Sequence, residues 1–179
     1  MDYFIMTQDR LLDEHMITFD GLRSAFRTLE VSRDRDQEIK DFTVVYVEGK
    51  DKVIPDLIDR PVVLMSDPLK KVIEMYDDEA LFKCTVLAHP AEEMQQTYWL
   101  LLVDRLDCLS DLTEYDPWGR PSRIVLDRNK AKGHAIFRIA GIDDPRLVIN
   151  LDVAESILRR DLWGIVLEPL ETKEEEKHE

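Results

Sequence analysis

The sequence predicts an α+β fold, with a mixed, mostly antiparallel sheet of several short strands and two or three packed helices. The chain has 179 residues, of which 44% are hydrophobic, and this is enough to bury the core of one domain. Short strand-like segments recur between turns that contain Gly or Pro, while helical spacing is confined to a few short stretches. This order lacks the regular alternation of a doubly wound fold. We therefore expect residues 1–170 to form a single α+β domain.

The N-terminal part of the chain contains a strand and one amphipathic segment. Residues 3–6, Tyr-Phe-Ile-Met, are typical of a short strand bounded by polar residues. Between Phe19 and Leu29 apolar residues recur at helical spacing, and Asp20 is placed to cap a helix at its start. We therefore expect a short helix there. Residues 31–40 have mixed charges without an apolar period, which predicts a solvated loop.

Further strands are expected through the middle of the chain. The clearest is 43–47, Thr-Val-Val-Tyr-Val, because β-branched and aromatic residues favour a pleated, half-buried surface. Residues 97–103, 122–127 and 135–139 are three more strand candidates, separated by turns with Pro or Gly. The middle of the protein is therefore predicted to be mostly sheet, within a domain of roughly seven to nine strands.

Two segments, 62–87 and 147–167, share one order of strand, helix and strand. In the first, Ser66 or Asp67 can accept hydrogen bonds from the free N–H groups at a helix start, and in the second Asp152 is placed to do so. We expect the helices to begin within about three residues of Asp67 and Asp152. The likeness makes the two segments a candidate internal repeat, with chance similarity as the alternative.

A pair of large apolar residues follows each of these expected helices. Leu81 and Phe82 follow the first, and Leu162 and Trp163 follow the second. At these points the chain returns to the sheet, so we expect the pairs to help bury each helix against it.

The charge of the chain bears on the class of partner. The formal net charge is −14 and the sequence pI is about 4.7. Such a field repels phosphate backbones and anionic lipid and attracts basic surfaces, so we expect neither a nucleic-acid nor a membrane partner. Residues 171–179 are expected to be an acidic, disordered tail.

The sequence also favours a cytoplasmic location. The opening residues lack the basic region of a signal peptide, and no apolar stretch approaches the roughly 20 residues that cross a bilayer. Cys84 and Cys108 are the two cysteines, without metal or redox spacing, which suits a reducing compartment.

Motifs for catalysis, metals or cofactors were not found. The six glycines form no phosphate-binding loop, and no serine lies in a nucleophile elbow. His15, His89, His134 and His178 lack metal-ligand spacing. The acidic stretch 104–116 lacks the frame of a calcium loop. We therefore expect no catalytic residue, no metal and no cofactor.

The strongest binding candidate is a turn-rich loop that combines aromatic and acidic residues: Asp111, Glu114, Tyr115, Asp116 and Trp118. Exposed aromatics beside charges of one sign are typical of interface hot spots. The alternative is that the tryptophan packs into the core. We interpret these five residues as a protein-binding site.

Several segments in order resemble a bacterial immunity-protein family of polymorphic toxin systems, formerly a family of unknown function. The resemblance covers most of the chain and rests on residues 3–6, 63–69, 98–101, 134–139 and 158–169. It implies a stable protein that binds and neutralises a cognate toxin, and it carries over no catalytic residues. With the acidic charge, it predicts a basic toxin domain as the partner.

Two other classes of function remain open at this point. One is an enzyme with an unrecognised active site, and the other is an adaptor or structural protein. A toxin-like reading frame beside the gene would favour immunity, whereas a metabolic operon would favour an enzyme. The oligomeric state is not set by the sequence.

Overall fold

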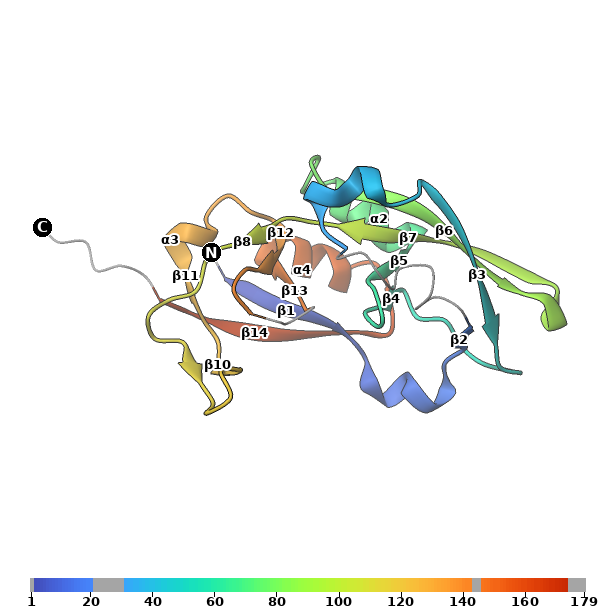
Figure 1. Ribbon diagram of the computed structural model, residues 1–179, viewed down its shortest axis with the longest axis horizontal. Coiled ribbons are helices and arrows are strands. Elements are labelled where there is room, and N and C mark those ends of the chain that lie inside the picture. Colours follow the sequence, from blue (N-terminus) through green and yellow to red (C-terminus); the bar gives the residue numbers. More distant parts are fainter. Residues whose placement is uncertain (1, 21–30, 143–145, 174–179) are drawn as a thin grey trace, which may run out of the picture.

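The computed structural model describes residues 2–20, 31–142 and 146–173. Within these residues, two six-stranded sheets occupy the two halves of an elongated molecule, and a two-stranded hairpin projects near one end (Figure 1). The first sheet has the order β11 (Val125–Asp127), β14 (Ile165–Lys173), β1 (Tyr3–Gln8), β13 (Leu147–Asn150), β12 (Ile136–Ile139) and β8 (Arg105–Leu106). The second has the order β2 (Thr18–Asp20), β3 (Phe42–Glu48), β6 (Leu81–His89), β7 (Met94–Leu102), β5 (Leu64–Ser66) and β4 (Leu57–Ile58). The hairpin pairs β9 (Glu114–Tyr115) with β10 (Pro121–Arg123).

Helices make up little of the described chain. Among the described residues the α-helices are α2 (Asp67–Glu74), α3 (Arg128–Ala131) and α4 (Leu151–Leu158), and the short 3-10 helices are η1 (Arg10–His15), η2 (Arg33–Glu38) and η3 (Pro90–Glu92). Antiparallel pairing prevails, but β11 with β14, β12 with β8, and β3 with β6 are parallel. The protein is therefore an α+β protein, as predicted. The strands form two mixed sheets instead of one, and they are more numerous than expected.

The two sheets share one central core. Helices α2 and α4 contact each other and both contribute to this core. Their buried residues are Leu69, Val72 and Ile73 from α2, and Val153, Ala154 and Ile157 from α4. Met6, Met65, Leu101 and Ile149 join them from strands of both sheets. Each helix thus buries its apolar face against its own sheet and against the other helix.

The segments 62–87 and 147–167 form units with the same strand pairing. In the first unit β5, α2 and β6 follow one another, and β7 lies between β5 and β6, antiparallel to both. In the second unit β13, α4 and β14 follow one another, and β1 lies between β13 and β14, again antiparallel to both. The N-terminal strand therefore fills in the second unit the place that β7 fills in the first. A common ancestry of the two segments remains a proposal.

Both helices begin where the sequence predicted. Helix α2 begins at Asp67, and the Ser66 hydroxyl accepts a hydrogen bond from the Leu69 N–H at 3.4 Å. Helix α4 begins at Leu151, but its cap is Asn150, whose Oδ1 accepts from the Val153 N–H at 3.0 Å. The prediction that Asp152 caps α4 is wrong, because β13 ends in extended backbone at Asn150 and puts Asp152 inside the first turn, where its charge suits the helix dipole.

The apolar pairs after the helices differ in their burial. Phe82 and Leu162 pack partly buried against the central core, as expected. Trp163 is 44% exposed, so its ring contributes less to burial of α4 than predicted. Its backbone is instead held by Asp56: the Trp163 N–H donates to Asp56 Oδ2 at 2.8 Å. The other oxygen of Asp56 accepts from the Ser66 hydroxyl, so one carboxylate ties the start of α2 to the loop after α4.

Four expected boundaries differ from the structure. Residues 18–20 form β2, so Phe19, expected on the helix, lies in a strand; the expected helix after Asp20 lies outside the described residues. The expected loop at 31–40 contains the 3-10 helix η2. The expected strand 122–127 divides at Ile124 into β10 and β11, which belong to different sheets. Strand β14 continues to Lys173, beyond the expected domain end at 170, because it pairs with both β1 and β11.

Candidate protein-binding site

The five predicted site residues come together on the segment that carries the β9–β10 hairpin. Tyr115 pairs with Pro121 and Glu114 with Arg123, so the two strands bring residues 114–123 into a compact projection. At the tip, the Gly119 N–H donates to the Asp116 carbonyl at 3.0 Å, which closes a turn with Pro117 at its second position. Gly119 has a φ of +78°, a conformation that glycine adopts without strain.

Asp116 holds this turn with its side chain. Its Oδ1 accepts hydrogen bonds from the Trp118 N–H at 2.9 Å and from the Arg120 N–H at 2.8 Å. The Asp116 N–H donates to the Arg120 carbonyl at 2.8 Å. An aspartate that bonds backbone groups in this way fixes the turn before any partner arrives.

The base of the hairpin is fixed to β11 by hydrogen bonds. The Ser110 N–H donates to the Val125 carbonyl at 2.9 Å, and the Thr113 hydroxyl donates to the same carbonyl at 3.0 Å. Below this point Cys108 is fully buried in the core beneath β11. The hairpin segment is therefore attached to a well-packed part of the core.

Two ion-pair groups join the hairpin segment to β14. Arg123 contacts Glu114 at 2.9 Å and makes two hydrogen bonds with Glu171. Lys173 contacts Asp111 at 2.7 Å. The Arg123 guanidinium lowers the pKa of Glu171, and the hydrogen bond from Lys173 lowers that of Asp111. Both lysine and arginine contacts are exposed to solvent, so they orient the hairpin more than they stabilise the fold.

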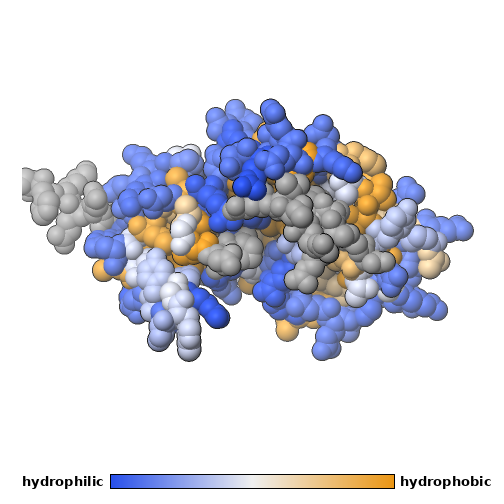
Figure 2. Space-filling view, viewed as in Figure 1, coloured by the Kyte–Doolittle hydropathy of each residue, from blue (hydrophilic) through white to orange (hydrophobic). Residues whose placement is uncertain are grey.

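The aromatic residues of the hairpin are open to solvent. Trp118 is 78% exposed and Tyr115 is 50% exposed, and Leu112 nearby is also exposed. Figure 2 shows the projecting hairpin in the pale colours of intermediate hydropathy. The alternative that Trp118 packs into the core is therefore wrong. Because the turn is already fixed, a partner that covers these side chains has little backbone to order.

The acidic residues of the predicted site are less free than the sequence suggests. Asp111 and Glu114 each face a cation, and Asp116 is engaged by two backbone N–H groups. The negative charges of the hairpin segment are therefore largely compensated by these local partners. The long-range negative field comes from the whole chain, whose net charge is −14.

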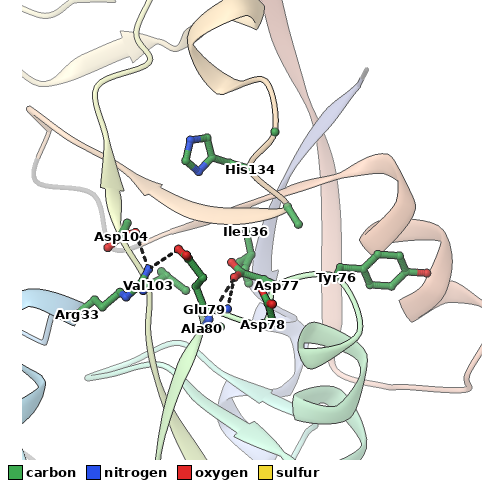
Figure 3. Close-up of a pocket in the computed structure, with 12 residues that line it drawn as sticks. Arg33, Tyr76, Asp77, Asp78, Glu79, Ala80, Val103, Asp104, His134 and Ile136 are labelled. Carbon is green, nitrogen blue, oxygen red and sulfur yellow. Dashed lines mark hydrogen bonds and ion pairs between the residues drawn. The ribbon is translucent and has the colours of Figure 1, made fainter.

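A second feature, a small acidic hollow, was not singled out from the sequence. It has a volume of about 210 Å³ and lies where the loop after α2 meets the end of β7 and the start of β12. Arg33 enters it and contacts Glu79 at 3.2 Å and Asp104 at 2.9 Å (Figure 3). The hydrogen bonds that Arg33 donates to these carboxylates raise its pKa, and the one to Glu79 has the largest effect. Asp77 Oδ1 accepts hydrogen bonds from the N–H groups of Glu79 and Ala80, and these bonds stabilise the turn that follows α2.

The acidic stretch 104–116 does not assemble into a cation site. Asp104 lies in the hollow, whereas Asp111, Glu114 and Asp116 lie on the hairpin segment. Across residues 2–20, 31–142 and 146–173, no group of three or more His, Cys, Asp or Glu is arranged to hold a metal ion. The helices in the same residues are too short or too polar to cross a membrane.

Comparisons with known proteins place the chain in a family. A comparison with curated proteins gives no match. The profile of a family described as "Immunity protein family (Imm11)" matches residues 5–172. This range includes every strand from β2 to β13, most of β1 and β14, and the whole hairpin. The resemblance inferred from the sequence is thereby confirmed, and the protein belongs to the Imm11 immunity protein family.

Proposed function

We propose that this protein binds a cognate toxin in the cytoplasm and neutralises it by covering the toxin's surface, without catalysis of its own. The observation that carries the proposal is the match to an immunity protein family over residues 5–172. Neutralisation by binding requires a stable scaffold with a preformed contact surface, because ordering a flexible surface would weaken the complex.

The hairpin segment supplies the proposed contact surface. Trp118 and Tyr115 present large, rigid side chains that can bury much area with few rotatable bonds. Asp116 holds the turn beneath them, and the ion pairs to Glu171 and Lys173 hold its orientation. We therefore propose that Asp111, Glu114, Tyr115, Asp116 and Trp118 form the toxin-binding site, with the aromatic residues as its centre.

A basic toxin domain is the proposed partner. The net charge of −14 would speed its approach from a distance. Because Asp111, Glu114 and Asp116 already have internal partners, each would contribute little by itself to that attraction. The association rate should therefore depend on salt more than on any one of these acids.

Cys108 supports the absence of catalysis at that thiol, and the two cysteines together support the cytoplasmic location. Burial raises the pKa of the Cys108 thiol to about 12, so it stays protonated and is a poor nucleophile at neutral pH. Cys84 and Cys108 are both free thiols, which suits a reducing compartment.

Co-expression with the product of the neighbouring toxin-like gene tests the proposal. We expect a stable complex and protection of the host. Trp118→Ala should raise the dissociation rate by about 30-fold or more, as for a hot-spot aromatic residue. Trp163→Ala is the matched control, because Trp163 is a partly exposed tryptophan outside the hairpin, and it should leave the rate within about twofold. If co-expression gives no complex and no protection of the host, the proposal is disproved.

Charge neutralisation tests the site separately. The combined change of Asp111→Asn, Glu114→Gln and Asp116→Asn should slow association moderately at low salt, by about threefold to tenfold, and much less at high salt. Glu155→Gln is the matched control, because Glu155 on α4 is also ion-paired and exposed. If protection occurs but the hairpin variants bind like the wild type, the toxin binds elsewhere on the protein.

A further inference from the structure

The tip of the β9–β10 hairpin carries a positive charge that the protein itself does not compensate. Arg120 is exposed at the end of the loop, two residues after Trp118. Its backbone is engaged, because its N–H donates to Asp116 Oδ1 at 2.8 Å and its carbonyl accepts from the Asp116 N–H at 2.8 Å. Its guanidinium makes no ion pair with any residue in 2–20, 31–142 or 146–173. A chain of net charge −14 thus presents a cation at its most projecting point.

The acidic side chains of the same segment are compensated locally. Their partners are Lys173 for Asp111, Arg123 for Glu114, and two backbone N–H groups for Asp116. Arg120 is therefore the charge that the tip offers to a partner at close range. A guanidinium that loses its water in an interface needs an anion beside it, because an unpaired buried charge is costly. The group that meets the tip should be acidic, even though the net charge attracts a partner that is basic as a whole.

The shape of the hairpin selects a concave partner. It projects from the sheets near one end of the molecule, and its tip is the loop 117–119, which the Asp116–Arg120 pair closes (Figure 1). Trp118 is 78% exposed and Tyr115 is 50% exposed. At about 200 Å² for each side chain, the two could bury on the order of 250 Å² against a flat partner. A stable interface buries about 800 Å² on each side. A recess that encloses both strands supplies the missing area.

We propose that the hairpin enters a recess in the surface of the toxin, where the Trp118 ring packs against an apolar wall and the Arg120 guanidinium pairs with an acidic side chain. This inference rests on the proposed toxin-binding function and specifies the surface of the partner that the hairpin contacts. Apolar recesses with a few polar groups are the usual binding sites for substrates and other small ligands. The hairpin would then neutralise the toxin by filling such a site, and the basic surface that the net charge attracts would lie around it.

The ionic contact is tested by measuring how Arg120→Gln binds the product of the neighbouring toxin-like gene. The substitution keeps the backbone N–H that donates to Asp116, so the turn stays closed. Dissociation should be faster by about 30-fold or more, because the acidic side chain of the toxin is left buried without its partner. Arg120→Lys keeps the charge and should lose less.

Lys132→Gln is the matched control for Arg120→Gln. Lys132 is exposed outside the hairpin, and its replacement changes the net charge by the same amount. Both substitutions make the chain more acidic, so long-range attraction to a basic toxin alone would leave binding unchanged or slightly stronger. Lys132→Gln should stay within about twofold of the wild type. Thermal unfolding of each variant checks that the fold is retained.

Photo-crosslinking in the complex tests the recess. The crosslinking amino acid p-benzoylphenylalanine would replace, one at a time, Trp118 at the tip, Tyr115 on β9 and Ser122 on β10. A recess encloses both strands, so all three positions should crosslink to the toxin. Leu158, 74% exposed at the end of α4, is the control position and should give no crosslink.

The results separate this inference from the proposed function. If the wild type gives neither a complex nor protection of the host, both are overturned. If the wild type binds and protects, but Arg120→Gln binds as tightly as the wild type or more tightly, the acidic contact is wrong and the proposed function stands. Crosslinks from position 118 alone would indicate a flat contact and would overturn the recess in the same way.

Discussion

Replacing Gly164 by alanine should destabilise the protein through two separate effects. Gly164 lies between α4 and β14 with a φ of +72°, a conformation that side chains rarely adopt. A Cβ at this position would lie 2.2 Å from Pro55 Cβ and 3.3 Å from Pro55 Cα. The proline ring and backbone cannot rotate away as a flexible side chain would. The Gly164 carbonyl also accepts from the Asp9 N–H at 3.0 Å, so the loop is held against movement.

The size of the effect follows from these two contributions. The left-handed conformation costs about 1–2 kcal/mol for alanine. Forcing a methyl group into a closely packed site costs about 1–3 kcal/mol more. The free energy of unfolding should therefore fall by about 2–5 kcal/mol. At about 2–4 °C per kcal/mol for a protein of this size, Tm should fall by about 10 °C.

Urea and thermal unfolding followed by circular dichroism measure this loss, and Gly141→Ala is the control. Gly141 has a φ of +79°, but nothing lies within 4 Å of a Cβ built there. Its substitution should therefore cost only the conformational part, about 1–2 kcal/mol. Equal losses for the two variants would refute the clash with Pro55 as a cause.

Three further predictions concern other contacts. Asp56→Ala removes the carboxylate that accepts the two hydrogen bonds between the start of α2 and the loop after α4. Urea unfolding should show a free energy of unfolding lower by about 1–3 kcal/mol. A loss below about 0.5 kcal/mol would contradict this role. Because Lys173 lowers the pKa of Asp111 below its ordinary value of 3.8, their contact should favour folding above that pH and be lost as pH falls through the folded pKa. Lys173→Met should raise the pKa of Asp111 in an NMR titration, and an unchanged value would argue against the pair. Iodoacetamide should label half-buried Cys84 faster than buried Cys108 in the native protein, and mass spectrometry showing equal rates would indicate that the core around Cys108 opens readily.

Local signals in the sequence were enough to position several elements. Helix α2 was predicted from polar residues that can cap it and from apolar residues at helical spacing, and it begins at Asp67. The strand at β3 was predicted from β-branched and aromatic residues and extends one residue further at each end. Caps and strand-forming side chains act over a few residues, so they can be recognised without knowledge of the fold.

Other features depended on partners distant in sequence. Asn150 caps α4 because β13 ends there in extended backbone, a boundary that its pairing with β1 helps to set. Strand β14 includes residues expected in a disordered tail because β11 pairs with its end. The sequence also could not show that Arg123 and Lys173 lie beside the acids of the hairpin segment, since each contact joins elements in different places along the chain.

The sequence by itself determined the α+β class, the approximate positions of the main strands and of α2 and α4, the net charge and the family. These depend on composition, short-range spacing and the order of segments. Only the tertiary structure decided that the strands form two sheets around paired helices, that Trp118 projects into solvent, and that one face of β3 is left open. Strand β3 carries apolar residues in both of its alternating positions, so its sequence is the same whether one face or both are covered. How much of that face is covered depends on the length of α2 relative to β6 and β7, because an eight-residue helix is much shorter than a nine-residue strand.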